Sequence, residues 1–138
     1  MSLFNIFNVA GSGMSAQSVR LNTTASNIAN ADAVSSSVDQ TYRARHPIFE
    51  AELSKAQQHQ NASMGVAVKG IVESDLPLNK EFSPDHPMAD TDGFIYKPNV
   101  NVMEEMADMI SASRSYQMNV QVTEAAKSML QQTLQIGK

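Results

Sequence analysis

Cysteine and tryptophan are both missing from this chain of 138 residues, and only 6% of its residues are aromatic. The lack of cysteine excludes disulfides and thiolate metal sites. No apolar run reaches the roughly eighteen residues that a membrane-spanning helix needs, so we predict no such helix. The N-terminus has no basic stretch followed by an apolar stretch, so we expect no conventional secretory signal peptide.

Charged residues are scarce at the start of the chain. Arg20 is the only charged side chain before Asp32, and the whole chain has a net charge of −4. An acidic balance argues against nucleic acid as a partner. Nine methionines are present, and their flexible thioether side chains suit surfaces that pack against a partner. The composition therefore favours a small domain or an elongated assembly subunit.

The stretch 98–138 gives the strongest secondary-structure signal, because it contains no glycine or proline between Pro98 and Gly137. Asn101 is a good N-cap residue, and Glu104 completes a capping box. We predict one helix about 50 Å long, which is too long for a domain of this size to cover. Apolar or small residues recur along one side with a coiled-coil-like period, at Val102, Met106, Met109, Ser113, Tyr116, Val120, Thr123, Leu130 and Leu134.

A second helix is predicted over residues 3–31. Phe7, Met14, Leu21 and Ile28 follow one another at intervals of seven, and smaller or polar residues occupy the alternate positions. Ser, Thr, Asn and Ala make up the other side, so we expect this helix to be ordered only when packed; an ordinary amphipathic core helix is the alternative. The segment 27–32 ends the helix, because Asn and Asp side chains bond to the local backbone.

The middle of the chain predicts a small β element of two to four short strands. Residues 66–73 alternate with a period of two, as in a half-buried strand, and 94–96 form a short apolar strand after a turn at Asp92-Gly93. The segment 42–53 fits either a short helix opened by Pro47 or an edge strand. Residues 57–63 are polar and are expected to form a mobile loop.

No pattern of reactive side chains predicts an enzyme, a cofactor site or a metal site. His46, His59 and His86 are too scattered for metal ligation. A calcium loop placed on Gly93 would have Met88 and Asn99 at positions that need carboxylates. The glycines at 11 and 13 lack the context of a phosphate loop, and the serines at 35–37 lack a nucleophile turn.

Several motifs resemble the bacterial flagellar rod and hook proteins. These are Asn27-Ile-Ala-Asn30-Ala after the first helix, and Glu104-Glu-Met-Ala-Asp-Met-Ile-Ser-Ala-Ser-Arg-Ser-Tyr-Gln-Met-Asn119 in the second. In the middle, Gly65-Val-Ala-Val-Lys-Gly-Ile-Val, Pro84-Asp-His-Pro-Met-Ala-Asp-Thr-Asp-Gly-Phe and Lys97-Pro-Asn-Val-Asn101 are similar to the proximal-rod members of that family. The usual Thr-x-Gly-Tyr turn of the family is loosened here to Ser35-Ser-Ser-Val-Asp-Gln-Thr-Tyr42.

The resemblance implies a structural subunit of the flagellar basal body that polymerises helically into the rod crossing the periplasm and transmits torque. It implies export by the flagellar type III apparatus without a cleaved signal. The implied partners are other copies of the chain, the rod proteins FlgB, FlgF, FlgG and FliE, and the export apparatus, with no nucleic acid and no small-molecule substrate. A soluble helical adaptor or export chaperone remains the alternative, and a more distal rod protein is a lesser one.

The expected fold is mainly α with a small β element. We predict an N-terminal assembly helix in residues 1–34, an irregular middle in 35–97 and a C-terminal assembly helix in 98–138, with the two helices packing as a coiled-coil-like pair or bundle in the assembly. The predicted assembly interface consists of Phe7, Met14, Leu21, Ile28, Val102, Met106, Met109, Tyr116, Val120, Leu130 and Leu134.

Overall fold

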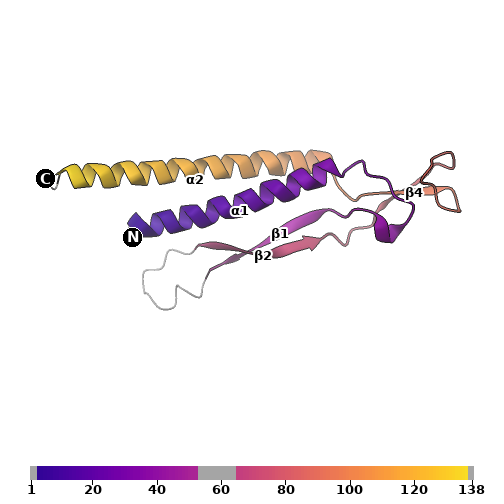
Figure 1. Cartoon of the computed structure of the whole chain (residues 1–138), viewed down its shortest axis with the longest axis horizontal. Coiled ribbons are helices and arrows are strands. Elements are labelled where there is room, and N and C mark those ends of the chain that lie inside the picture. Colours follow the sequence, from indigo (N-terminus) through magenta and orange to yellow (C-terminus); the bar gives the residue numbers. More distant parts are fainter. Residues whose placement is uncertain (1–2, 53–64, 137–138) are drawn as a thin grey trace.

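Two long helices from the ends of the chain form the largest part of the molecule. A computed structural model describes residues 3–52 and 65–136. In it, α1 spans Leu3–Ala29 and α2 spans Val102–Ile136, which confirms both predicted helices. The two helices run antiparallel and side by side, so that α1 begins and α2 ends at the same end of the molecule (Figure 1).

The helix boundaries follow from local side-chain hydrogen bonds. The Asn101 Oδ1 atom accepts a hydrogen bond of 3.2 Å from the backbone N–H of Met103, which confirms Asn101 as the N-cap of α2. At the end of α1, the Asn30 amide donates to the backbone oxygen of Ser26 at 2.8 Å, as predicted for an asparagine that closes a helix. The side chain of Asn27 bonds to Arg45 and Glu105 instead of to the local backbone of the helix end.

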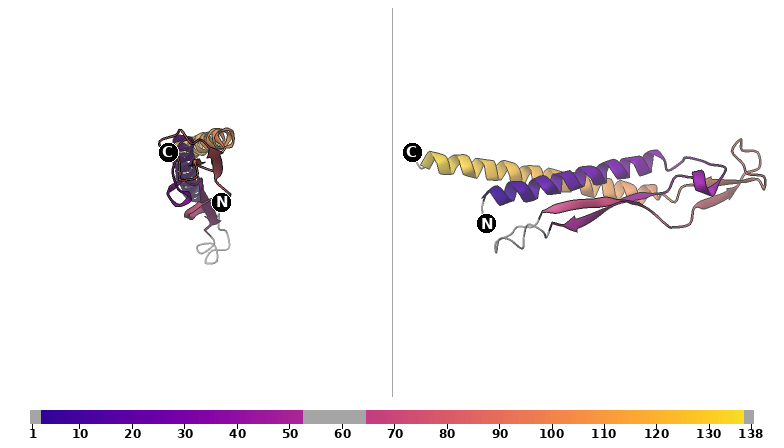
Figure 2. Two further views of the ribbon diagram at one scale, coloured as in Figure 1. Left: turned by 90° about the vertical axis from the view of Figure 1, so that its right-hand side faces the viewer. Right: turned by 60° about the horizontal axis from the view of Figure 1, so that its bottom comes forward.

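A two-stranded ribbon packs against the side of α1 that α2 leaves open. Strand β1 spans Arg45–Ala51 and pairs antiparallel with β2, which spans Val66–Glu73. Both strands contact α1, so α1 lies between α2 and the ribbon (Figures 1 and 2). The ambiguous segment 42–53 is therefore a strand, and Pro47 is tolerated because a two-stranded ribbon has no central strand.

The ribbon is more exposed than its alternating pattern predicted. Strand β2 is confirmed, but Val66 and Val72, on the side expected to be half-buried, are 38% and 45% exposed. The prediction of a half-buried face is wrong at these two positions. The physical reason is that α1 is the only described helix that makes extensive contact with the ribbon. One helix covers part of the ribbon face, whereas a complete second layer would bury all of it.

A second β pair lies at the far end of the molecule (Figure 1). Strand β3, Asn79–Phe82, pairs antiparallel with β4, Phe94–Lys97, and a short 3-10 helix, η1, spans Val38–Gln40. The predicted strand at 94–96 and the turn before it are confirmed; Gly93 has φ 76°, a backbone conformation that suits glycine. Strand β3 was not predicted, since its sequence Asn-Lys-Glu-Phe has no alternating apolar pattern.

In residues 3–52 and 65–136, neither helix is apolar over a long enough stretch to cross a membrane. The polar segment predicted to be a mobile loop, 57–63, lies outside the described residues. The division into residues 1–34, 35–97 and 98–138 stays a prediction.

Candidate assembly surfaces

Three contacts along the helix pair define how α1 lies against α2. Near the start of α1, a Cβ atom on Gly13 would lie 2.9 Å from the Asn119 amide nitrogen, so the two helices approach closely there. In the middle, the Arg20 guanidinium forms an ion pair of 2.7 Å with Asp108. Near the end of α1, the amide of Asn27 bonds to the carboxylate of Glu105 at 2.9 Å.

Small residues line the buried side of α2. Ala112 and Ala126 are 0% and 4% exposed, and α1 is the only described element with which α2 makes extensive contact. Small side chains let two helix backbones approach closely, as the absence of a Cβ atom at Gly13 does on the other helix. The centre of the helix contact is therefore made by small and polar residues and not by large apolar ones.

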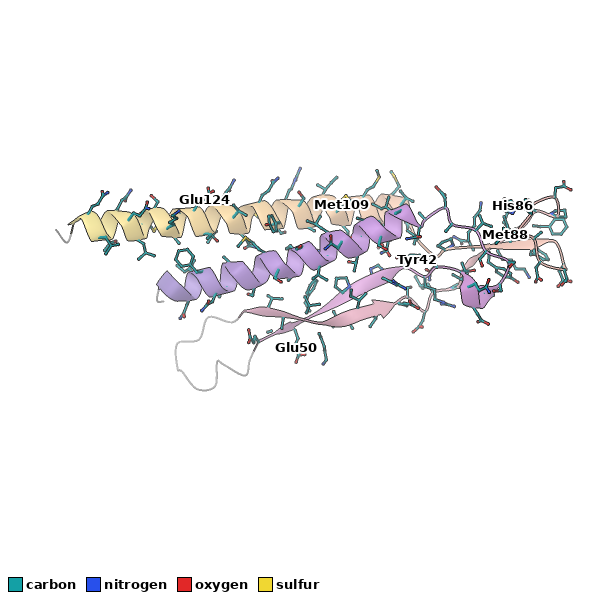
Figure 3. All side chains as sticks on the ribbon, viewed as in Figure 1. Tyr42, Glu50, His86, Met88, Met109 and Glu124 are labelled. Carbon is teal, nitrogen blue, oxygen red and sulfur yellow. The ribbon has the colours of Figure 1, made fainter. Side chains whose placement is uncertain are left out.

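Asn27 is the centre of a buried hydrogen-bond network and is fully inaccessible. Its Nδ2 atom donates to the backbone oxygen of Arg45 at 2.8 Å and to Glu105 Oε1 at 2.9 Å. Its Oδ1 atom accepts from the backbone N–H of Arg45 and from the Tyr42 hydroxyl, both at 2.9 Å. All four hydrogen-bonding positions of the amide are occupied. This side chain joins α1, α2 and β1, with Tyr42 beside the end of α1 (Figure 3).

Burial raises the pKa of the Glu105 carboxyl above its ordinary value, because desolvation disfavours the charged form. The hydrogen bond from Asn27 and the electrostatic interaction with His46 lower this pKa, and Asp108 and Glu104 add to the increase. The sequence analysis missed both members of this pair. It assigned Asn27 to the local backbone, and the sequence carries no signal that joins residues 78 positions apart.

The structure leaves the predicted interface residues partly or largely exposed after α1 and α2 have paired. Seven of them are half-buried: Phe7, Met14, Leu21, Ile28, Met109, Val120 and Leu130. Four are exposed, at 36% for Val102, 50% for Met106, 39% for Tyr116 and 70% for Leu134. These residues therefore keep surface available after α1 and α2 have paired.

Helix α2 exposes large apolar side chains, most of which are not among the predicted residues. We call these residues the outer face of α2: Met103, Met106, Ile110, Met118, Val122 and Met129, each 47–77% exposed. They lie away from the buried alanines of the same helix, since Ile110 is 56% exposed while Ala112 is fully buried. The methionines of α2 were the sequence signal for this face. The predicted coiled-coil period included Met106 but none of the other residues of the face.

The outer face of α1 has a different composition. It consists of exposed small or amide side chains spaced by three, four or seven, at Asn8, Ser15, Ser18, Asn22, Ala25 and Ala29. No charged residue lies among them, and the one charged residue of α1, Arg20, is already paired with Asp108. The sequence predicted such a face from its composition, and the structure confirms that its residues are exposed.

Comparison with known proteins identifies the family. The family described as "flagella basal body rod protein" matches residues 7–35, and "flagellar basal body rod FlgEFG protein C-terminal" matches residues 91–136. Over the full length of both chains, the flagellar basal-body rod protein FlgC is 44% identical in Salmonella typhimurium, 46% in Yersinia enterocolitica and 33% in Bacillus subtilis. The chain belongs to the flagellar basal-body rod protein family. The resemblance seen in its sequence motifs is confirmed.

The two family matches coincide with the two helices of this rod-family fold. The first covers most of α1 and the turn after it, and the second covers β4 and all of α2. Asn27 lies within the first match and Glu105 within the second. The two matched ranges therefore contain the segments that build the helix pair and its outer faces.

Proposed function

We propose that this protein is a structural subunit of the flagellar basal-body rod, and that it polymerises helically with copies of itself and with other rod proteins. One observation carries the proposal. After α1 and α2 have paired within the chain, α1 still presents a long outer face without charge, and α2 still exposes large apolar side chains along most of its length, with Arg114 among them. A helix face without charge and a row of exposed large apolar side chains are both unusual on a solvated helix and are suited to burial against neighbouring subunits.

The size of these faces favours a polymer over a stable pair. A helix face about 30 Å long and about 10 Å wide offers roughly 300 Å² to a neighbour. A stable pairwise interface needs about 1,000 Å² in total, so a single contact of this kind is weak. Many such contacts made together resist shear, which is the mechanical requirement of a rod that transmits torque. Contacts between different faces of successive copies also generate open helical assemblies.

The predicted interface residues have a place in this proposal. Half-buried positions are held by Phe7, Met14, Leu21 and Ile28 of α1 and by Met109 and Val120 of α2, so each keeps part of its surface exposed. A neighbouring helix that packs along this line would complete their burial, as in a coiled-coil-like bundle. The partners would be the other rod proteins, and the location would be the rod crossing the periplasm, reached through the flagellar export apparatus.

A soluble helical adaptor or export chaperone is the second candidate. The observation that favours it is the antiparallel pairing of α1 with α2 inside one chain, since a helical hairpin does not need neighbours to bury its central contact. Membership of the rod family supports the structural role instead.

Incorporation of an outer-face variant tests the proposal. Ile110→Asp places a charge on the outer face of α2, where the side chain is 56% exposed, so the folded monomer should tolerate it. In cells that lack the wild-type chain, we expect this variant to be made at a normal level but to be missing from purified basal bodies. Leu76→Asp is the matched control, because Leu76 is 65% exposed and lies outside both helices. Normal rods containing Ile110→Asp would contradict the proposed outer-face contact.

A further inference from the structure

Methionines are the most easily oxidised side chains of this chain. The sequence contains nine of them and neither cysteine nor tryptophan. A two-electron oxidant such as a peroxide therefore reacts first with the thioether sulfurs. The product, methionine sulfoxide, is polar, whereas the original side chain is flexible and apolar. Where methionines gather on one surface, an oxidant changes the polarity of that surface.

Methionines gather in this way on the outer face of α2. We call four of its residues the outer-face methionines, each 50–77% exposed: Met103, Met106, Met118 and Met129. Two other methionines of the helix pair, Met14 and Met109, are half-buried. Met88, in the loop between β3 and β4, is 42% exposed and lies outside both helices. Because exposure governs the rate of methionine oxidation, the outer-face methionines should react ahead of Met14 and Met109.

We propose that the outer-face methionines are a site of oxidative modification, and that a peroxide which converts them to sulfoxides keeps the subunit out of the rod. At each methionine the sulfur gives two electrons to the peroxide and takes one of its oxygen atoms, while the other oxygen leaves as water with both hydrogens. The loss of assembly, but not the order of oxidation, rests on the proposed burial of this face by a neighbouring subunit.

The sulfoxides should disturb assembly and leave the fold of the chain intact. In the free chain each new oxygen faces water, since α2 packs against α1 through its other side, where Ala112 and Ala126 are buried. In a contact made with Ile110 and Val122 of the same face, the sulfoxide oxygens would lose that water. Burying a polar group without a hydrogen-bond partner is unfavourable. Oxidation therefore opposes burial of the face.

Oxidation of the purified chain tests the site itself. The protein is treated with hydrogen peroxide, mass spectrometry follows each methionine, and circular dichroism measures the helix content. We expect the outer-face methionines to be oxidised at least about threefold faster than Met14 and Met109, with unchanged helix content. Equal rates at these positions, or loss of helix as the outer face is oxidised, would overturn the proposal.

Glutamine at the four positions imitates the sulfoxide permanently, because it is similar in size and helix propensity to methionine and carries a polar oxygen. This variant combines Met103→Gln, Met106→Gln, Met118→Gln and Met129→Gln. The matched control has leucine at the same four positions, which keeps them apolar and cannot be oxidised. Met88→Gln is the control outside the helices. In cells that lack the wild-type chain, we expect the fourfold Gln variant to be depleted from purified basal bodies by about tenfold or more, and both controls to be incorporated normally.

A competition in one cell links this result to the chemistry. The native chain and the fourfold Leu variant are made together, and mass spectrometry gives their ratio in purified basal bodies with and without peroxide during assembly. We expect peroxide to lower the native share by about threefold or more, since only the native outer face can be oxidised. An unchanged ratio would overturn the proposal.

Ile110→Asp separates failure of this proposal from failure of the proposed function. If Ile110→Asp is excluded from rods and the fourfold Gln variant enters them normally, the outer face is buried and the oxidation proposal alone is overturned. If both variants enter normally, the outer face is not buried and both proposals fail.

Discussion

The helices α1 and α2 both come from an end of the chain, but they are covered to different degrees. α1 is packed on two sides, by α2 and by the β1–β2 ribbon, whereas α2 has α1 as its only extensive neighbour among the described elements. Among the described residues, nine large apolar side chains of α2 are exposed. The exposed described side chains of α1 are all small or polar. The difference indicates that α1 is the internal support of the subunit and that α2 carries most of the exposed apolar surface of the helix pair.

The largest expected effect separates the inner side of α2 from its outer side. Ala112→Asp introduces a charge at a fully buried position against α1, so we expect it to lower the free energy of unfolding by about 3 kcal/mol or more. Ile110→Asp, two residues away on the outer face, should change it by no more than about 0.5 kcal/mol. Urea unfolding followed by circular dichroism measures both. Equal losses in the two variants would mean that α2 is not packed on one side only.

A smaller effect compares two glycines within α1. A Cβ atom at Gly11 would meet no atom within 4 Å, so Gly11→Ala should stabilise the helix by about 0.5–1 kcal/mol. At Gly13 the same atom would lie 2.9 Å from the Asn119 amide nitrogen, and the gain in helix propensity is offset by displacement of that side chain.

Thermal unfolding of the two glycine variants measures this difference. Gly13→Ala should therefore unfold at a lower temperature than Gly11→Ala. The reverse order would contradict the close approach of the two helices at this point.

The smallest effect concerns the pH dependence of the polar contact between the helices. Because burial raises the folded-state pKa of Glu105 above its ordinary value of 4.5, the folded chain holds this proton more tightly than the unfolded chain. The resulting stabilisation is present below pH 4.5 and is lost as the pH rises through the raised pKa.

Glu105→Gln removes this titration. We expect the variant to be more stable than the native chain at pH 7 and to lack the decline in stability that begins above pH 4.5. Unfolding curves collected between pH 4 and pH 8 test the expectation. Identical pH profiles for the two proteins would show that Glu105 does not titrate in this environment.

The sequence predicted elements whose signal is local and repeated. Both helices, the strand over residues 66–73 and the strand at 94–96 follow from periodicity, capping residues and a turn, and the N-cap at Asn101 was placed correctly. Strand β3 could not be predicted, because a short polar strand is defined by its partner β4 and not by its own residues. The choice between helix and strand around Pro47 likewise depended on pairing with Ile71.

The surfaces were predicted less completely than the elements. A heptad period marked Met106 and Met109 but missed Met103, Ile110 and Met118. One heptad pattern follows a single line along a helix, whereas α2 has both an inner side against α1 and an outer face. The Asn27–Glu105 contact was missed because antiparallel pairing within the chain joins the two residues, and neither periodicity nor composition reports that pairing.

The central claim is that a neighbouring rod subunit buries the outer face of α2. Site-specific photo-crosslinking in assembled basal bodies would test this claim more directly than any other measurement. A photoreactive amino acid is placed at Ile110 on the outer face or at Ala125, which is also exposed on α2, and Leu76 serves as the position outside the helices. We predict that Ile110 yields crosslinks to another copy of the chain or to another rod protein, and that these disappear when the subunits are kept unassembled. Crosslinks from Ile110 to its own chain alone, or none in intact rods, would contradict the account.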